Sequence, residues 1–193
     1  MVNNKSELRN KYSFMRKSLS IKQIEESSLS ISNKLFEIPI WNKKFYHIFL
    51  TSKKKKELNT RFILDILVKK NKSVVVPKMI DKNSLEHVLL TEKTVIKENS
   101  FGILEPFSQN DKIVEPNILD VVIIPLIIFD LNGNRVGYGK GYYDRFLKTC
   151  RKDIIKIGIS FFEPVDSIID VSKNDVSLDL SLIHISEPTR PLE

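Results

Sequence analysis

Residues 121–150 read VVIIPLIIFDLNGNRVGYGKGYYDRFLKTC, and the rest of the chain is organised around this stretch. Residues 121–129 form an apolar run rich in β-branched side chains, which predicts a strand buried on both faces. Residues 142–150 have the apolar spacing of a helix. Between them, residues 133–141 hold four of the six glycines of the chain. A strand that leads through a glycine-rich turn into a helix presents backbone N–H groups to an anion, so this loop is a candidate phosphate site.

The loop fits neither of the two common phosphate-binding motifs. A P-loop requires Ser or Thr after its Gly-Lys pair, but here Gly139 and Lys140 are followed by Gly141. The dinucleotide motif requires the spacing G-x-G-x-x-G, whereas residues 137–141 have the spacing G-x-G-x-G. If the loop binds phosphate, it therefore belongs to a third kind of phosphate-binding loop.

Charged side chains accompany the glycines. Arg135 and Lys140 are cations that can neutralise phosphates, and Asp144 is a carboxylate in the first turn of the expected helix that can hold Mg²⁺. A nucleoside triphosphate site requires this combination. The alternative interpretation is a flexible surface turn, but a plain turn needs one or two glycines and has no use for these charges and three tyrosines.

Residues 132–144, Asn-Gly-Asn-Arg-Val-Gly-Tyr-Gly-Lys-Gly-Tyr-Tyr-Asp, resemble the signature of the 5-formyltetrahydrofolate cyclo-ligase family. The resemblance covers the chain from about residue 5 to residue 179. It implies a three-layer α/β/α sandwich with a mainly parallel, Rossmann-like sheet. It also implies ATP-dependent cyclisation of 5-formyltetrahydrofolate to 5,10-methenyltetrahydrofolate, with phosphorylation of the formyl oxygen, attack by N10 and release of ADP and phosphate. ATP is then a co-substrate and Mg²⁺ the cofactor.

The resemblance also assigns roles to residues far from the loop. Lys5 and Arg9, four residues apart on a first helix, are expected to bind the ATP phosphates. Glu57 is expected to bind the pterin, whose N–H donors a carboxylate matches well. The full expected set is Arg135, Lys140, Tyr142 and Asp144 as catalytic residues; Lys5, Arg9, Arg135, Val136, Gly137, Tyr138, Gly139, Lys140, Gly141, Tyr142 and Tyr143 for ATP; Leu50, Glu57, Phe101, Tyr138, Gly139, Lys140, Gly141 and Tyr142 for the folate; and Asp144 and Asp175 for Mg²⁺.

Two helices are predicted before the first strand. Residues 5–19 have helical spacing, with Leu8, Tyr12 and Met15 on one apolar face. Ser20 and Gln23 form a capping box that begins the second helix. We expect the two helices to pack as an antiparallel pair on the sheet.

The middle and end of the chain predict further strands. Residues 45–51, 60–70 and 73–77 read as strand, helix and strand, which implies a parallel βαβ unit. Residues 83–90 predict an edge strand, and residues 154–161 predict another strand of the sheet.

Length and composition indicate one domain, which we place at residues 1–180 of the 193. Residues 181–193 depart from the family pattern, and we interpret them as a tail that is not native. No apolar run approaches the roughly 20 residues of a membrane span, so no membrane partner is expected. The single cysteine excludes an internal disulfide, and we expect a cytoplasmic monomer.

The net charge of +7 is spread along the whole chain and most simply reflects a solvated basic surface. We therefore expect small-molecule substrates and no nucleic acid. A basic nucleotide- or RNA-binding protein that keeps the loop without ligase activity stays open as the alternative. Glu57 and Asp144 argue against it, because carboxylates repel a phosphate backbone unless Mg²⁺ lies between them.

Overall fold

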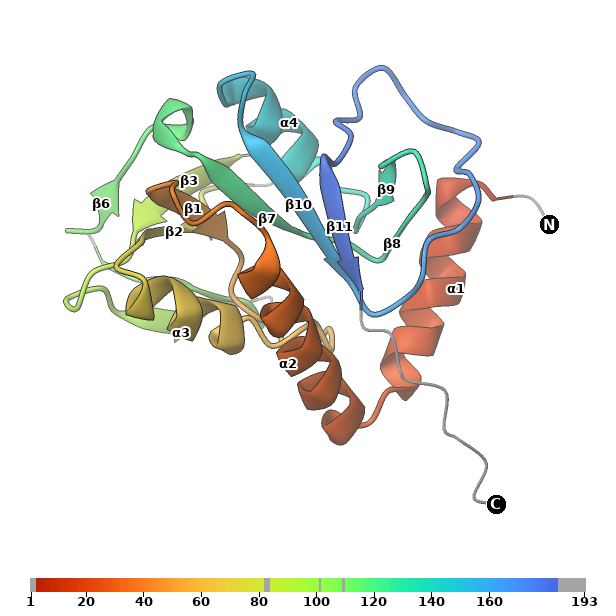
Figure 1. Ribbon diagram of the computed structural model, residues 1–193, viewed down its shortest axis with the longest axis horizontal. Coiled ribbons are helices and arrows are strands. Elements are labelled where there is room, and N and C mark those ends of the chain that lie inside the picture. Colours follow the sequence, from red (N-terminus) through yellow and green to blue (C-terminus); the bar gives the residue numbers. More distant parts are fainter. Residues whose placement is uncertain (1–2, 82–83, 101, 109, 184–193) are drawn as a thin grey trace.

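The structure is a computed structural model that describes residues 3–81, 84–100, 102–108 and 110–183. Its centre is a seven-stranded sheet in the order β11-β10-β7-β1-β2-β3-β6 (Figure 1). Two small two-stranded sheets, β4-β5 and β8-β9, lie outside it. The strands are β1 Phe45–Ile48, β2 Ser73–Met79, β3 Leu85–Leu89, β4 Ile96–Glu98, β5 Leu104–Pro106, β6 Lys112–Ile113, β7 Val121–Pro125, β8 Ile128–Phe129, β9 Arg135–Val136, β10 Ile155–Ser160 and β11 Leu180–Ile183.

Most of the central sheet is parallel, as the sequence predicts. β7 pairs in parallel with β1 and β10, and β1 pairs in parallel with β2. The helix α3, Arg61–Lys69, connects β1 to β2, which confirms the βαβ unit. β3 is antiparallel to β2 and pairs on its other side with the short strand β6, so it lies one position inside the edge that was expected for it.

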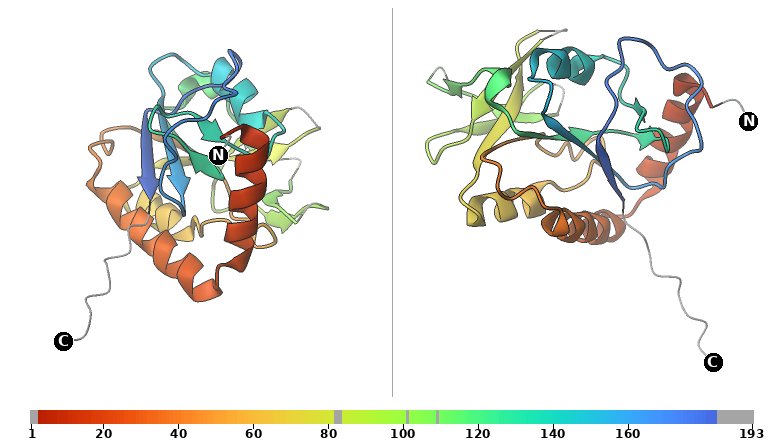
Figure 2. Two further views of the ribbon diagram at one scale, coloured as in Figure 1. Left: turned by 90° about the vertical axis from the view of Figure 1, so that its right-hand side faces the viewer. Right: turned by 45° about the horizontal axis from the view of Figure 1, so that its top comes forward.

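Helices cover both faces of the sheet, which confirms the three-layer sandwich. The helix α2, Ile21–Glu37, packs with α3 on one face, and α4, Tyr142–Thr149, packs on the other (Figures 1 and 2). β7 is buried between these layers: its Ile123 belongs to the core under α2 and α3, and its Ile124 belongs to the core under α4. Across the described ranges, every helix falls short of the length and hydropathy that a membrane-spanning segment needs.

The prediction that the first two helices form an antiparallel pair is wrong for the first helix, α1 Lys5–Ser18. It lies beside the β8-β9 hairpin rather than alongside α2 (Figure 1), and its buried Leu8 packs with Ile128 and Val136 of that hairpin. The apolar face of α2 packs on the central sheet, so the apolar face of α1 packs on the hairpin instead. Met15, which was expected on the buried face, is 38% exposed, whereas Arg16 is only 6% exposed.

Residues 121–129 form two strands and not one. β7 ends at Pro125, whose missing N–H cannot continue the ladder, and the chain then turns into β8. β8 pairs with β9 to make a hairpin whose turn is held by Asp130: its Oδ1 accepts hydrogen bonds from the backbone N of Asn134 at 2.8 Å and of Asn132 at 3.0 Å. This hairpin carries the chain to the glycine-rich loop.

The strand β11 reaches into the segment that the sequence assigned to an atypical tail. Its residues pair in parallel with β10, from Ile157 with Leu180 to Ser160 with Ile183. Residues 181–183 are therefore part of the sheet. Residues 184–193 lie outside the described residues, and their interpretation as a non-native end stays a prediction.

Candidate functional site

A cleft with a volume of about 1030 Å³ lies at the carboxyl ends of three parallel strands. Leu50 follows β1, Met79 ends β2 and Pro125 ends β7, and all three line the cleft. Open α/β sheets bind their ligands at this edge. Because pockets for drug-sized ligands are usually about 300–1,000 Å³, the cleft has room for two substrates of moderate size.

Most of the residues that the sequence analysis selected meet on the wall of this cleft. Val136 is an exception, because it is fully buried in β9 and its side chain packs in the core beside α1. Phe101 lies outside the described residues. The selected residues that line the cleft are Lys5, Arg9, Leu50, Glu57, Arg135, Gly137, Tyr138, Gly139, Lys140, Gly141, Tyr142, Tyr143, Asp144 and Asp175.

The glycine-rich loop needs its glycines for two physical reasons. Gly139 and Gly141 have φ angles of +84° and +67°, a left-handed conformation that other residues adopt at a cost. Gly139 also lies against Arg9, because a Cβ on Gly139 would sit 3.3 Å from the guanidinium carbon of Arg9. The Arg9 Nε donates a hydrogen bond to the Gly137 carbonyl at 2.8 Å. The first helix and the loop therefore form one wall.

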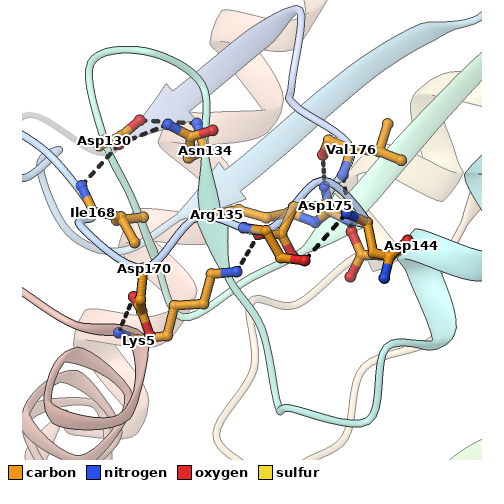
Figure 3. Close-up of polar contacts among 11 residues, drawn as sticks. Lys5, Asp130, Asn134, Arg135, Asp144, Ile168, Asp170, Asp175 and Val176 are labelled. Carbon is orange, nitrogen blue, oxygen red and sulfur yellow. Dashed lines mark hydrogen bonds and ion pairs between the residues drawn. The ribbon is translucent and has the colours of Figure 1, made fainter.

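Arg135 is a buried cation that links two segments of the site, around Asp144 and Val176. Its side chain is 6% exposed, and its Nη2 donates to Asp144 Oδ1 at 2.6 Å. Its Nη1 donates to the carbonyl of Val176, whose own N–H donates to Asp144 Oδ1 at 3.1 Å (Figure 3). The sequence analysis expected Arg135 to face phosphates, but in this structure its main contacts hold Asp144 and the segment around residue 176 together.

Asp175 reaches the same wall from the carboxyl-terminal segment. It forms an ion pair with Lys5 of α1, and the backbone N of Ser172 donates to its Oδ2 at 2.6 Å (Figure 3). Burial alone would raise the pKa of Asp175, but the hydrogen bonds from Lys5 and Ser172 and the charges of Lys5 and Arg135 outweigh it, so its pKa is lowered. Asp175 therefore stays a carboxylate at neutral pH.

Asp144 and Asp175 form a donor set that suits Mg²⁺ with a bound nucleotide. Both are hard oxygen ligands on the cleft wall, and both now neutralise cations. Within the described part of the chain, no three His, Cys, Asp or Glu side chains gather closely enough to hold a metal alone. Mg²⁺ usually takes one or two carboxylates together with water and substrate phosphates, so two carboxylates fit that ion.

Glu57 also lines the cleft and is mostly buried, with an exposure of 8%. Its Oε2 accepts a hydrogen bond from the backbone N of Ser52 at 2.8 Å, and its Oε1 accepts one from the Tyr138 hydroxyl. Burial and the charge of Glu57 raise the pKa of Tyr138, so its phenol keeps its proton. The carboxylate expected to recognise the pterin thus already has a donor from the glycine-rich loop.

The other residues of the loop take three different positions. Lys140 is exposed, and Tyr142 donates from its hydroxyl to the carbonyl of Asp81 at 2.9 Å. The Tyr143 hydroxyl is buried, and among the described atoms it has no hydrogen-bond partner. Burial and the charge of Glu57 raise the pKa of Tyr143.

Sequence reasoning missed two cations of the site. Arg16 lies seven residues after Arg9 and shares its helix face, and this helical spacing is a signal that could have pointed to it. Lys55, one of four consecutive lysines at residues 53–56, also lines the cleft, and its Nζ lies 4.3 Å from the centre of the Tyr138 ring. Nothing in the run of four lysines distinguishes Lys55 from its neighbours.

The chain is similar to known proteins over nearly its whole length. The pattern of the 5-formyltetrahydrofolate cyclo-ligase family matches residues 1–183. A Schizosaccharomyces pombe protein named "probable 5-formyltetrahydrofolate cyclo-ligase" is 31% identical over 169 residues, which cover 81% of this chain and 83% of that protein. A solved 5,10-methenyltetrahydrofolate synthetase from Mycoplasma pneumoniae superimposes with a TM-score of 0.72 at 28% identity, covering 92% of this chain and 97% of that one. The corresponding enzyme of Aquifex aeolicus gives a TM-score of 0.71 at 26% identity, over 98% and 96% of the two chains.

Proposed function

Because this chain belongs to the 5-formyltetrahydrofolate cyclo-ligase family, we propose that it converts 5-formyltetrahydrofolate and ATP to 5,10-methenyltetrahydrofolate, ADP and phosphate. Membership of this family makes the chain a ligase. The observation that carries the proposal is the shared cleft. Glu57, a carboxylate suited to a pterin, and Lys5 and Arg9, cations suited to phosphates, line the same cavity as the glycine-rich loop.

The chemistry explains why the cleft must hold both substrates together. The formyl oxygen is a poor leaving group, so N10 cannot displace it directly. Transfer of the γ-phosphoryl group from ATP to that oxygen gives an iminium phosphate and ADP. N10 then bonds to the formyl carbon and loses its proton to solvent, the carbon–oxygen bond breaks, and the oxygen leaves with phosphate. Such a reaction depends on positioning and charge neutralisation and needs no nucleophilic side chain.

The residues of the cleft fit these tasks. Lys5, Arg9 and Lys140 line the cleft and would supply positive charge to the phosphates of ATP. Tyr142 lines the same cleft, and its hydroxyl donates a hydrogen bond to the carbonyl of Asp81. Glu57 accepts the N–H donors of the pterin.

Asp144 and Asp175 would hold Mg²⁺ on the cleft wall. When bound, this ion neutralises charge on the β- and γ-phosphates. The ion pair with Arg135 keeps Asp144 in place before the substrates bind.

The competing function, binding of RNA or nucleotides without ligation, fits the cleft less well. Its wall includes five carboxylates, Glu57, Asp81, Glu105, Asp144 and Asp175, which repel a polyanionic backbone. A small ligand that brings its own cation meets no such obstacle. We accordingly propose a monomeric cytoplasmic enzyme with small-molecule substrates.

The decisive experiment measures phosphate release from ATP by the purified chain in the presence of Mg²⁺, with and without 5-formyltetrahydrofolate. We expect release only when the folate is present, in a one-to-one ratio with the methenyl product detected by its absorbance. Asp144→Asn serves as the inactive control. The competing function would be supported by phosphate release that does not depend on the folate. It would also be supported if the chain bound single-stranded RNA and showed no turnover.

A further inference from the structure

Arg16 is a buried cation that the proposed reaction does not use. It lies near the end of α1 and is 6% exposed. Burying a cation costs several kcal/mol unless specific partners compensate for the lost hydration. The surface helix α1 has solvent-facing positions, where Lys11 and Lys17 are exposed, so the burial of Arg16 requires an explanation.

The surroundings of Arg16 supply that reason. Its guanidinium carbon lies 5.2 Å from the centre of the Tyr138 ring, within cation–π range. It also borders a small cavity of about 10 Å³ that Glu57 and Ser160 line, which is about the size that a single water molecule occupies. The Arg16 guanidinium also acts to lower the pKa of the Tyr138 phenol, which opposes the raising effects of burial and of Glu57.

These contacts form a chain across three elements. Arg16 of α1 lies over the Tyr138 ring of the glycine-rich loop, and the Tyr138 hydroxyl donates to Glu57 in the loop after β1. Glu57 is fixed at its other oxygen by the Ser52 backbone N at 2.8 Å. We propose that Arg16 is a positioning residue that holds Tyr138 against Glu57 and thereby couples the folate-binding carboxylate to the loop around the ATP phosphates.

The coupling rests on the proposed function and has a definite sign. Pterin N–H groups that bind Glu57 compete with Tyr138 for the same carboxylate charge. Tyr138 stands between Gly137 and Gly139, and the glycines let the loop change its backbone at little cost when this hydroxyl is released. The released loop can then close on the phosphates, so the folate should tighten nucleotide binding, and by linkage the nucleotide should tighten folate binding equally.

The side chain at position 16 needs the shape of arginine as well as its charge. A guanidinium stacks on an aromatic ring while it donates hydrogen bonds in its plane, whereas a lysine ammonium is a compact point charge. Arg16→Lys should therefore weaken the coupling although it keeps the charge. Arg16→Met keeps a similar volume and removes the cation from the Tyr138 ring, and Tyr138→Phe removes only the hydroxyl that donates to Glu57.

The test measures the affinity of the full chain for a nonhydrolysable ATP analogue by calorimetry, with and without saturating 5-formyltetrahydrofolate. For the native chain we expect the folate to tighten the analogue by about 5-fold or more, within the usual range of coupling between sites. The ratio should fall to about 1 in Arg16→Met and Tyr138→Phe, and the double variant should behave as either single one. Arg61→Met is the matched control, because Arg61 is an exposed arginine at the start of α3.

The possible failures are distinguishable. Thermal melting shows which variants fold, and if Arg16→Met does not, Arg16→Lys and Tyr138→Phe decide the question. A native chain that forms methenyl product and binds both ligands with no coupling overturns this inference alone, as does full coupling in Tyr138→Phe. A native chain that neither binds the folate nor makes product overturns the proposed function, and the inference falls with it.

Discussion

Lys5 and Asp175 are 170 residues apart in the sequence and form an ion pair on the wall of the cleft. This pair joins the first helix to the carboxyl-terminal segment and brings a residue selected for phosphate to a residue selected for Mg²⁺. Each neutralises the other in the free protein. Bound ATP and Mg²⁺ would offer each of them a more specific partner, so the pair keeps both charges in place until the substrates arrive.

Lys5→Gln tests the phosphate role of α1. Charge-assisted hydrogen bonds contribute about 1.5–3 kcal/mol, so we expect KM for ATP to rise about 10-fold or more while KM for the folate changes little. Steady-state kinetics with each substrate varied in turn checks this expectation. Deletion of residues 1–10 is a poorer test, because it also removes the buried Leu8.

Lys11→Gln is the matched control, because Lys11 lies on the same helix and is exposed. Both variants should melt at similar temperatures. Equal effects of the two substitutions on KM for ATP would show that only the general charge of the helix matters.

Asp144→Asn tests the metal-binding role of the cleft carboxylates. A hard cation prefers charged oxygens, so we expect kcat to fall at least about 100-fold while the folate alone still binds. Asp175→Asn should show a milder loss that excess Mg²⁺ partly restores. Titration of Mg²⁺ in each variant measures the difference, with Asp65→Asn on the exposed side of α3 as control. Near-normal turnover of Asp144→Asn at limiting Mg²⁺ would contradict the metal-binding role. Asp144 would then have only a structural role, through its contacts with Arg135 and Val176.

Glu57→Gln tests recognition of the pterin. Glutamine keeps the size of the side chain and an acceptor for the Ser52 N–H, but it loses the charge that two pterin donors match. KM for 5-formyltetrahydrofolate should rise about 10-fold or more, and KM for ATP should rise less. A parallel rise in both constants would contradict the assignment of Glu57 to the folate.

The part of the fold that local patterns control was predictable from the sequence. β7 is read from a run of β-branched residues, and the capping box of Ser20 and Gln23 begins α2 as expected. The loop after β9 was recognised because its glycines and charges have few other uses. The break at Pro125 was missed because the apolar run continues through it, although proline lacks the N–H that a ladder needs.

The partners of charged side chains were not predictable, because they depend on contacts between distant segments. Arg135 and Asp144 were both selected, yet their mutual ion pair follows from the β8-β9 hairpin and cannot be read from spacing. Arg16 was passed over because a cation on a first helix is usually solvated. Its burial depends on Tyr138, which lies 122 positions later in the numbering of the chain.

Truncation at two points tests the role of β11. A chain that ends at Ile183 keeps all four register pairs between β10 and β11 and should fold and turn over as the full chain does. A chain that ends at Asp179 loses the strand and the packing of Leu182 and Ile183 on the two cores, so it should melt several degrees lower. Equal melting temperatures for both truncations would show that β11 adds nothing to stability.

The buried histidine pair predicts how stability depends on pH. His47 of β1 is fully buried and His87 of β3 is 5% exposed, and their ring centres lie 5.2 Å apart beside Phe146 of α4. In the described part of the chain, neither nitrogen of His47 has a hydrogen-bond partner. Burial lowers the pKa of His47, with a further contribution from the charge of His87, and burial lowers the pKa of His87 to about 4.

The sign of the effect follows from these directions. Both pKa values lie below the ordinary value of 6.5, so between pH 6.5 and about 4 the unfolded chain binds protons that the folded chain does not. Stability should be fully present above pH 6.5 and fall by up to about 1.4 kcal/mol per pH unit for each histidine as the pH drops. Urea denaturation at half-unit steps from pH 7.5 to 4.5 measures this slope. Burial would raise the pKa of Asp120, but hydrogen bonds from the Phe45 and Lys44 backbone and from Arg151 lower it below 3.8. The pKa of Asp120 therefore lies outside the pH range of this titration. His87→Phe should flatten the slope by about half, and an unchanged slope in that variant would show that other groups govern the acid sensitivity.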